Sequence, residues 1–203
     1  MFVCLEGIDG AGKSTQSRLL CDHLSANGIP AEMVFDPGTT KLGLAIRQLL
    51  LDCDDPISPA AQMLLFSAAR AELSAHIREK LAAGVTIICD RWILSTLVYQ
   101  CAINNIDRDL VISIFKGTSV VPDLCVLLDI SPEVAESRKA DEARKDRYER
   151  SSMAEKQAMR AAYLTYAKDS ACSKRIAVMN ADDEQSVVHA DICELVQYLH
   201  SQT

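Results

Sequence analysis

A glycine-rich segment near the start of the chain carries the clearest chemistry. Residues 7–14 read Gly-Ile-Asp-Gly-Ala-Gly-Lys-Ser and follow the apolar run Phe2-Val3-Cys4-Leu5. This is the pattern G-x-x-x-x-G-K-[ST] between a strand and a helix, where backbone N–H groups surround phosphates. The lysine can reach a β- or γ-phosphate, and the serine hydroxyl can bind Mg²⁺. We therefore expect contacts to a nucleoside triphosphate from Gly7, Ile8, Asp9, Gly10, Ala11, Gly12, Lys13, Ser14 and Thr15.

A charged pair follows a second apolar run. Asp90 and Arg91 come directly after residues 85–89, a stretch typical of a strand buried on both faces. Ligands of open α/β sheets bind beyond the carboxyl ends of the strands, where this pair is expected to lie. A carboxylate there can help hold Mg²⁺, and an arginine can bind a phosphate through two hydrogen bonds.

Two helical segments carry polar or aromatic groups at helical spacing. Phe66 and Arg70 lie four residues apart, so they share a face that could stack on a base and hydrogen-bond to its edge. The alternative is that Phe66 is a core residue and Arg70 a solvated one. Residues 95–100 likewise place Ser95 with Tyr99, and Thr96 with Gln100, on adjoining faces. These groups could bind substrate or belong to a half-exposed helix.

A basic segment covers residues 138–150, in which six of thirteen residues are Lys or Arg. Interleaved acidic residues fit a solvated charged helix. The other interpretation is a lid whose arginines close over the phosphates, because phosphoryl transfer needs charge neutralisation and exclusion of water.

Strand and helix signals alternate along the chain, which predicts a parallel sheet covered by helices on both faces. Strands are expected at about 2–6, 31–35, 85–89, 124–130 and 175–179. Helices are expected at about 13–27, 41–52, 59–83, 93–103, 107–117, 132–140, 152–171 and 184–201. With 203 residues and no linker, one domain over 1–203 is expected.

Composition excludes several protein classes. The formal charge of −7 argues against general attraction to nucleic acid. No stretch approaches the roughly 18 apolar residues of a membrane span, and the early phosphate-binding segment leaves no room for a signal peptide. The eight cysteines form no C-x-x-C pair, which argues against zinc and against a disulfide framework. Cys4, Cys89 and Cys125 should be buried in strands, and a reducing cytoplasm fits best.

Together these segments resemble the thymidylate kinases, within the nucleoside monophosphate kinase family. The matching stretches, in family order over residues 2 to about 150, are FVCLEGIDGAGKST, DPGTTKLGLAIRQLLLD, LLFSAARAEL, VTIICDRWILSTLVYQ, PDLCVLLDISPEVAESR and DRYE. The resemblance implies an adenylate-kinase-like, three-layer α/β/α fold with five parallel strands and a short lid at about 138–150. It also implies a homodimer packed through helices, and a Mg²⁺-dependent transfer of the γ-phosphate of ATP to dTMP that gives dTDP.

The resemblance further implies contacts to the acceptor nucleotide. Asp9 would accept from the sugar 3′-hydroxyl, Phe66 would stack on thymine, and Arg70 would donate to thymine O4. Tyr99 would crowd the sugar 2′ position, and Arg91 would hold the acceptor phosphate. The full set expected to bind the acceptor is Asp9, Asp36, Pro37, Phe66, Arg70, Arg91, Ser95, Thr96, Tyr99 and Gln100.

Catalytic and metal-binding roles follow in the same way. Ser14 and Asp90 would place Mg²⁺. The family includes chains with an arginine inside the phosphate-binding loop and chains that supply it from the lid, and Gly10-Ala11 makes this one resemble the lid type. The groups expected to neutralise the transferring phosphate are Lys13, Arg91, Arg138 and Arg147, with Arg144 a further candidate.

Three departures from the family pattern fall on the acceptor side. The segment Asp36-Pro37-Gly38-Thr39-Thr40 stands where Glu-Pro-Gly-Gly-Thr is common. Phe35 replaces the usual arginine, so one phosphate contact would be lost or come from Lys41. Trp92 replaces the usual tyrosine after Asp90-Arg91. Specificity for another or several monophosphates therefore stays open.

Two further functions stay open. A deoxynucleoside kinase would need a carboxylate base near a sugar hydroxyl, for which Glu6 or Asp36 could serve. A non-catalytic nucleotide-binding switch would bind tightly without turnover, but the sequence contains no N-K-x-D segment that would read guanine.

Overall fold

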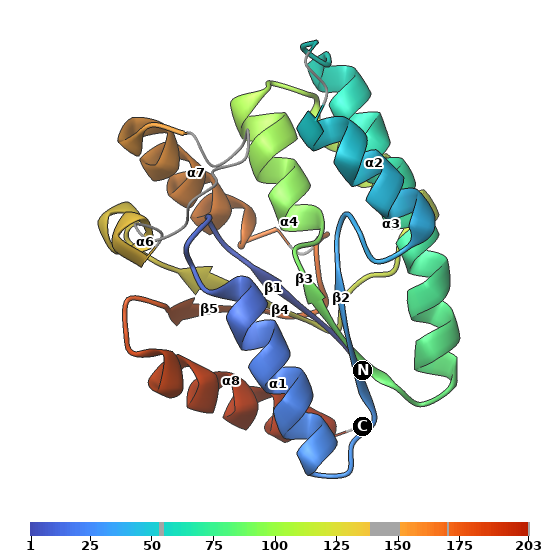
Figure 1. Cartoon of the computed structure of the whole chain (residues 1–203), viewed down its shortest axis with the longest axis vertical. Coiled ribbons are helices and arrows are strands. Elements are labelled where there is room, and N and C mark those ends of the chain that lie inside the picture. The colour runs from blue at the N-terminus through green and yellow to red at the C-terminus, as the bar shows by residue number, and fades with distance from the viewer. Residues whose placement is uncertain (53–54, 139–150, 170, 203) are drawn as a thin grey trace.

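The computed structural model describes residues 1–52, 55–138, 151–169 and 171–202. Within them, five strands form one parallel sheet in the order β2-β3-β1-β4-β5 (Figure 1). The strands are β1 (Phe2–Glu6), β2 (Ala31–Phe35), β3 (Thr86–Asp90), β4 (Leu124–Asp129) and β5 (Ile176–Asn180). The expected α/β fold with five parallel strands is confirmed.

The three central strands are buried on both faces, which explains why they read as continuous apolar runs. In the register of β1, Cys4 lies opposite Cys89 on β3 and opposite Cys125 on β4. All three cysteines are buried, as expected. The edge strands β2 and β5 are partly exposed and have a weaker apolar pattern.

Helices cover the sheet on both faces. Helices α1 (Lys13–Ala26) and α8 (Gln185–His200) lie side by side on one face (Figure 1). The other layer contains α3 (Pro59–Ala82), α4 (Ile93–Thr96), the π-helix η1 (Leu97–Ile103), α5 (Arg108–Thr118) and α7 (Met153–Tyr166). Helix α2 (Lys41–Asp52) packs on α3, and α6 (Pro132–Arg138) packs on α7.

Two expected helices differ from the structure. The helix expected at 93–103 is α-helical only to Thr96 and continues as the π-helix η1; such turns are rare and often occur at functional sites. The helix expected at 152–171 ends at Tyr166. In the turn that follows, the Asp169 carboxylate accepts from Ala171 N at 3.0 Å and from Arg108 Nε at 2.9 Å. The strands expected at 85–89 and 175–179 begin and end one residue later.

None of the helices in the described part of the chain is both long enough and apolar enough to cross a membrane.

Candidate active site

A cavity of about 800 Å³ opens beyond the carboxyl ends of β1, β2 and β3. Parallel strands end at the same edge, so three loops far apart in sequence meet there. The glycine-rich loop follows β1, Asp36 follows β2, and Asp90-Arg91 ends β3. Side chains from α3, η1 and the start of α8 complete the walls.

The glycine-rich loop has the conformation that its sequence predicts. Gly10 has φ 88°, and a Cβ there would lie 2.4 Å from the Ala135 carbonyl oxygen, so another residue would clash. Helix α1 begins at Lys13, which points the positive end of its dipole at the cavity. Lys13 Nζ donates to the Ile8 carbonyl at 2.8 Å. Burial, followed by repulsion from Arg91, lowers the pKa of Lys13 to about 8, although Asp9 opposes the shift.

Two oxygen groups meet where the loop faces β3. The Ser14 hydroxyl donates to Asp90 Oδ2. The other carboxylate oxygen, Asp90 Oδ1, is buried and has no hydrogen-bond partner among the described residues. A buried carboxylate oxygen without a donor is costly unless something binds it. Oxygen ligands suit Mg²⁺, so Ser14 and Asp90 fit the metal expected there.

Arg91 lies at the centre of the site. Its Nη1 donates to Ser95 Oγ at 3.1 Å and to Tyr163 Oη at 3.2 Å, and its Nη2 pairs with the Asp9 carboxylate. Its backbone has φ 68°, which is unusual for a residue other than glycine. Buried Glu6 supports this conformation from below by accepting from Trp92 N at 2.7 Å and from Ser95 Oγ at 2.6 Å.

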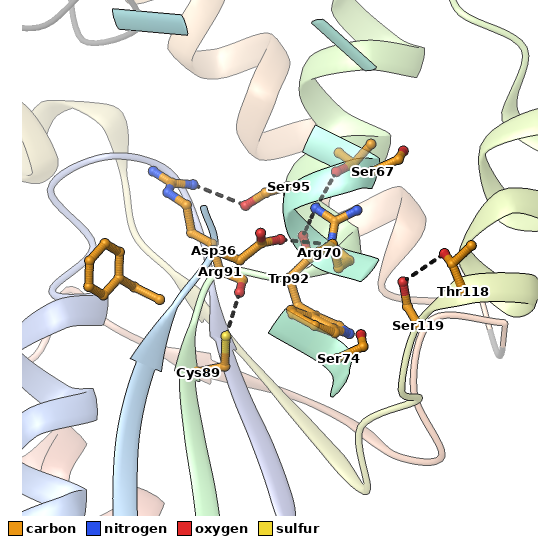
Figure 2. Close-up of polar contacts among 12 residues, drawn as sticks. Asp36, Ser67, Arg70, Ser74, Cys89, Arg91, Trp92, Ser95, Thr118 and Ser119 are labelled. Atoms are coloured by element: carbon orange, nitrogen blue, oxygen red, sulfur yellow. Dashed lines mark hydrogen bonds and ion pairs between the residues drawn. The ribbon is translucent and has the colours of Figure 1, made fainter. Parts of the chain in front are cut away.

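A second buried ion pair stands beside the first. Arg70 on α3 donates through Nε to Asp36 Oδ2 at 2.7 Å and through Nη2 to Thr96 Oγ1 at 2.7 Å. Figure 2 shows Arg70 and Asp36 pointing toward one another, with Arg70 above the Trp92 ring. Arg70 is 3% exposed, so the alternative of a solvated arginine is wrong. Its Nη1 makes no hydrogen bond within the described residues and remains a donor for a ligand.

The remaining wall combines aromatic and amide groups. Phe66 is half-buried and lines the cavity, so it is not simply a core residue. Thr96 and Gln100 are buried and Tyr99 is nearly so, all lining the cavity, so the alternative of a half-exposed helix is wrong. Gln100 Oε1 accepts from Asn104, while its Nε2 is buried without a partner in the described part of the chain.

The three departures have different structural consequences. Thr39 replaces a glycine without strain, because its hydroxyl accepts from Phe35 N at 2.8 Å and donates to Phe35 O at 3.1 Å. The ring of Trp92 lies in the core, with its Nε1 donating to the Val120 carbonyl at 3.0 Å, and does not line the cavity. Lys41 is exposed and does not line the cavity.

Arg47, rather than Lys41, is the basic residue of this segment that lines the cavity. Its guanidinium lies 5.9 Å from the centre of the Phe35 ring and donates to the Pro37 carbonyl at 3.3 Å. Both Arg47 and Phe35 line the cavity. The sequence contained a signal for this residue, since Arg47 and Lys41 are the two basic residues of the apolar segment 41–52.

Other residues at the cavity or in contact with its lining had no sequence signal. Tyr163 contacts Arg91 from α7, 72 positions away along the chain. The wall nearest the glycine-rich loop includes residues from the C-terminal part of the chain, namely Ala181, Asp183, Gln185 and Val188.

Of the basic segment, only Arg138 is described. It is exposed, lines the cavity and donates to the Asp183 carbonyl at 3.0 Å. Arg144, Arg147 and the rest of the expected lid lie outside the described residues.

Known proteins match this chain over nearly its whole length. A family model described as thymidylate kinase matches residues 5–192. Thymidylate kinase of Pelodictyon phaeoclathratiforme is 38% identical, covering 97% of this chain and 95% of the relative; that of Symbiobacterium thermophilum is 37% identical, covering 97% and 92%. A crystal structure of thymidylate kinase from Ehrlichia chaffeensis matches with a TM-score of 0.76 at 28% identity, covering 97% of this chain and 98% of that one. The protein is therefore a member of the thymidylate kinase family.

Proposed function

We propose that the protein transfers the γ-phosphate of ATP to dTMP and so forms dTDP. The observation that carries the proposal is a single cavity that joins a triphosphate-binding loop to a base-sized wall of Phe66, Arg70 and Gln100. Arg91 lies between the two parts, where a donor and an acceptor phosphate would meet. Family membership supports the same reaction.

The acceptor wall suits a pyrimidine with carbonyl groups. Phe66 supplies an aromatic surface for stacking, and Arg70 Nη1 and Gln100 Nε2 are unused donors that thymine carbonyls could accept. Tyr99 stands beside Asp9, with 3.5 Å between the phenol oxygen and the carboxylate, and this proximity supports a shared role at the sugar. We propose that this pair selects a deoxyribose.

The donor side would act by position and charge. Backbone N–H groups of the loop and the start of α1 would hold the triphosphate, and Lys13 and Arg91 would neutralise the transferring group. Mg²⁺, when bound by Ser14 and Asp90, would neutralise charge on the β- and γ-phosphates. Arg138 lies at the rim, so it could add a further charge from the start of the lid.

A sugar-hydroxyl kinase fits the site less well. Glu6 was one candidate base, but it is fully buried, does not line the cavity and is occupied by Trp92 and Ser95. Asp36, the other candidate, is held by Arg70.

Steady-state assays with ATP and Mg²⁺ would test the function, using dTMP, dUMP, dCMP, dGMP, dAMP and thymidine separately. We expect fast conversion of dTMP, and loss of turnover by orders of magnitude in Lys13→Ala with the fold intact. Lys116→Ala, on exposed α5 surface, is the matched control and should keep normal turnover. Consumption of thymidine but not dTMP, or full activity in Lys13→Ala, would refute the proposal.

We also propose that the protein is a homodimer. Several large apolar side chains on α2 and α3 are exposed in the single chain, which is typical of a surface that a partner covers. They are Leu42, Leu44, Leu49 and Leu64. Sedimentation equilibrium would test this, and Leu44→Glu with Leu64→Glu should yield a monomer.

The cytoplasm is the compartment that we propose. All seven cysteines in the described part of the chain are free thiols, as expected where disulfides are kept reduced.

A further inference from the structure

A group of nitrogen and sulfur side chains lies between α1 and α8, the two helices seen side by side in Figure 1. His23 is in the last turn of α1, and His189 and Cys193 are one turn apart on α8. One ligand atom from each residue lies within 4.8 Å of the others. None of the three lines the active-site cavity, so the cluster is separate from the proposed Mg²⁺ site.

The spacing of the cluster suits a tetrahedral metal. Cys193 Sγ lies 3.4 Å from His189 Nε2. Zinc bonds of about 2.3 Å to sulfur and about 2.1 Å to nitrogen, at a tetrahedral angle, would put these two atoms about 3.6 Å apart. Because the residues are four apart on one helix, both side chains already face the same way. Little movement would be needed on α8.

Two side-chain amides contact the third residue, His23. Gln197 Nε2 lies 2.8 Å from His23 Nε2, and Asn27 Nδ2 lies 3.5 Å from it. An amide nitrogen is a donor, so Gln197 occupies this ring nitrogen and must turn away before the nitrogen can bind a metal. A neutral imidazole is the form that binds metal. The His23 and His189 rings meet edge to face with centroids 5.9 Å apart, which brings the two ligands from different helices together.

We propose that His23, His189 and Cys193 bind a divalent transition metal that favours thiolate and imidazole, with Zn²⁺ the best fit and a fourth position left to water. Zinc binds mixed sets of imidazole and thiolate ligands, and with three protein ligands it keeps the fourth position for water. Our expectation against zinc considered only C-x-x-C pairs, whereas these ligands come from residues 23 and 189–193.

A metal here would join two helices that both shape the active site. The N-terminus of α1 faces the cavity, and the start of α8 contributes Gln185 and Val188 to the cavity wall. Gln16 already links the same helices nearer the cavity by donating to the Gln185 carbonyl at 2.9 Å. Binding should therefore raise the thermal stability of the native protein.

Titration of metal-free protein with Co²⁺ in excess Mg²⁺ tests the site. We expect one equivalent to produce the visible bands of tetrahedral cobalt together with a near-ultraviolet thiolate-to-cobalt charge-transfer band. Zn²⁺ should remove both by competition. Only a site containing a cysteine can give the second band, so binding at Ser14 and Asp90 would not be mistaken for it.

Variants identify the ligands. Cys193→Ser should abolish the charge-transfer band, and His189→Gln or His23→Gln should weaken Co²⁺ binding at least about ten-fold, since losing even an outer partner costs 10–100-fold. Cys101→Ser is the matched control, because Cys101 and Cys193 are each 7% exposed. Circular dichroism and kinase activity without zinc would verify folding of each variant. No charge-transfer band in the wild type, or a band that persists in Cys193→Ser, would overturn the proposal.

Discussion

Removal of the Arg70 guanidinium should destabilise the protein strongly, because the buried carboxylate of Asp36 then has no positively charged partner. The side chains of Arg70 and Asp36 are 4% and 1% exposed. Arg70→Met keeps much of the apolar volume but strands a buried charge, which costs about 3–5 kcal/mol. Since domains of ordinary stability unfold with about 5–15 kcal/mol, the loss should be a large part of the total.

The loss should depend on pH in a defined direction. Burial raises the pKa of Asp36 in the native protein, and Arg70 opposes this shift. Without Arg70 the folded-state pKa rises further above the unfolded value. When the folded-state pKa of a carboxyl group lies above its unfolded-state pKa, the protein is most stable below the unfolded-state pKa, where the group is protonated in both states. This stability is lost as the pH rises through the folded-state pKa. Arg70→Met should therefore lower the free energy of unfolding, relative to the wild type, by more at pH 8 than at pH 5.

Urea unfolding followed by circular dichroism would measure the loss of stability and its dependence on pH. The variants can be compared if their unfolding free energies depend on urea concentration with the same slope. Asp36→Asn combined with Arg70→Met should recover about 2 kcal/mol, because no buried charge then remains. Arg78→Met is the matched control on exposed α3 surface and should change the free energy by less than about 0.5 kcal/mol. The reasoning fails if Arg70→Met costs under about 1 kcal/mol at pH 8, or if the double variant is no more stable.

Three more outcomes are expected. Gly10→Ala should abolish ATP-dependent turnover and lower Tm, because its Cβ would lie 2.4 Å from the Ala135 carbonyl; an active, equally stable variant would contradict this. The pKa of Lys13 is about 8, so above pH 8 the lysine must take up a proton when ATP binds. The KM for ATP should therefore rise about ten-fold per pH unit above pH 8, and a KM that does not change with pH would contradict this. Phe66→Leu should raise the KM for dTMP about ten-fold and leave the KM for ATP unchanged, with Tyr198→Leu, an exposed aromatic away from the cavity, as control.

Local patterns were enough for the parts of the site that lie within one segment. The glycine-rich loop is a contiguous run between a strand and a helix, so its sequence pattern alone was enough to locate it. The i, i+4 spacing of Phe66 with Arg70 placed both on the cavity side of α3 for the same reason. Burial on both faces made the central strands recognisable as apolar runs.

Contacts between segments needed the tertiary structure. Parallel strands are joined through helices, so side chains that meet at one sheet edge are tens of residues apart and share no period in the sequence. Glu6 could be assigned as a support only when Trp92 and Ser95 were seen bonded to it. Tyr163 reaches Arg91, and His23 reaches His189, only because α7 and α8 pack back onto the sheet. Sequence therefore determined the glycine-rich loop and the fold class, while packing determined which charges are paired, which donors remain for a ligand, and which side chains of α1 and α8 meet.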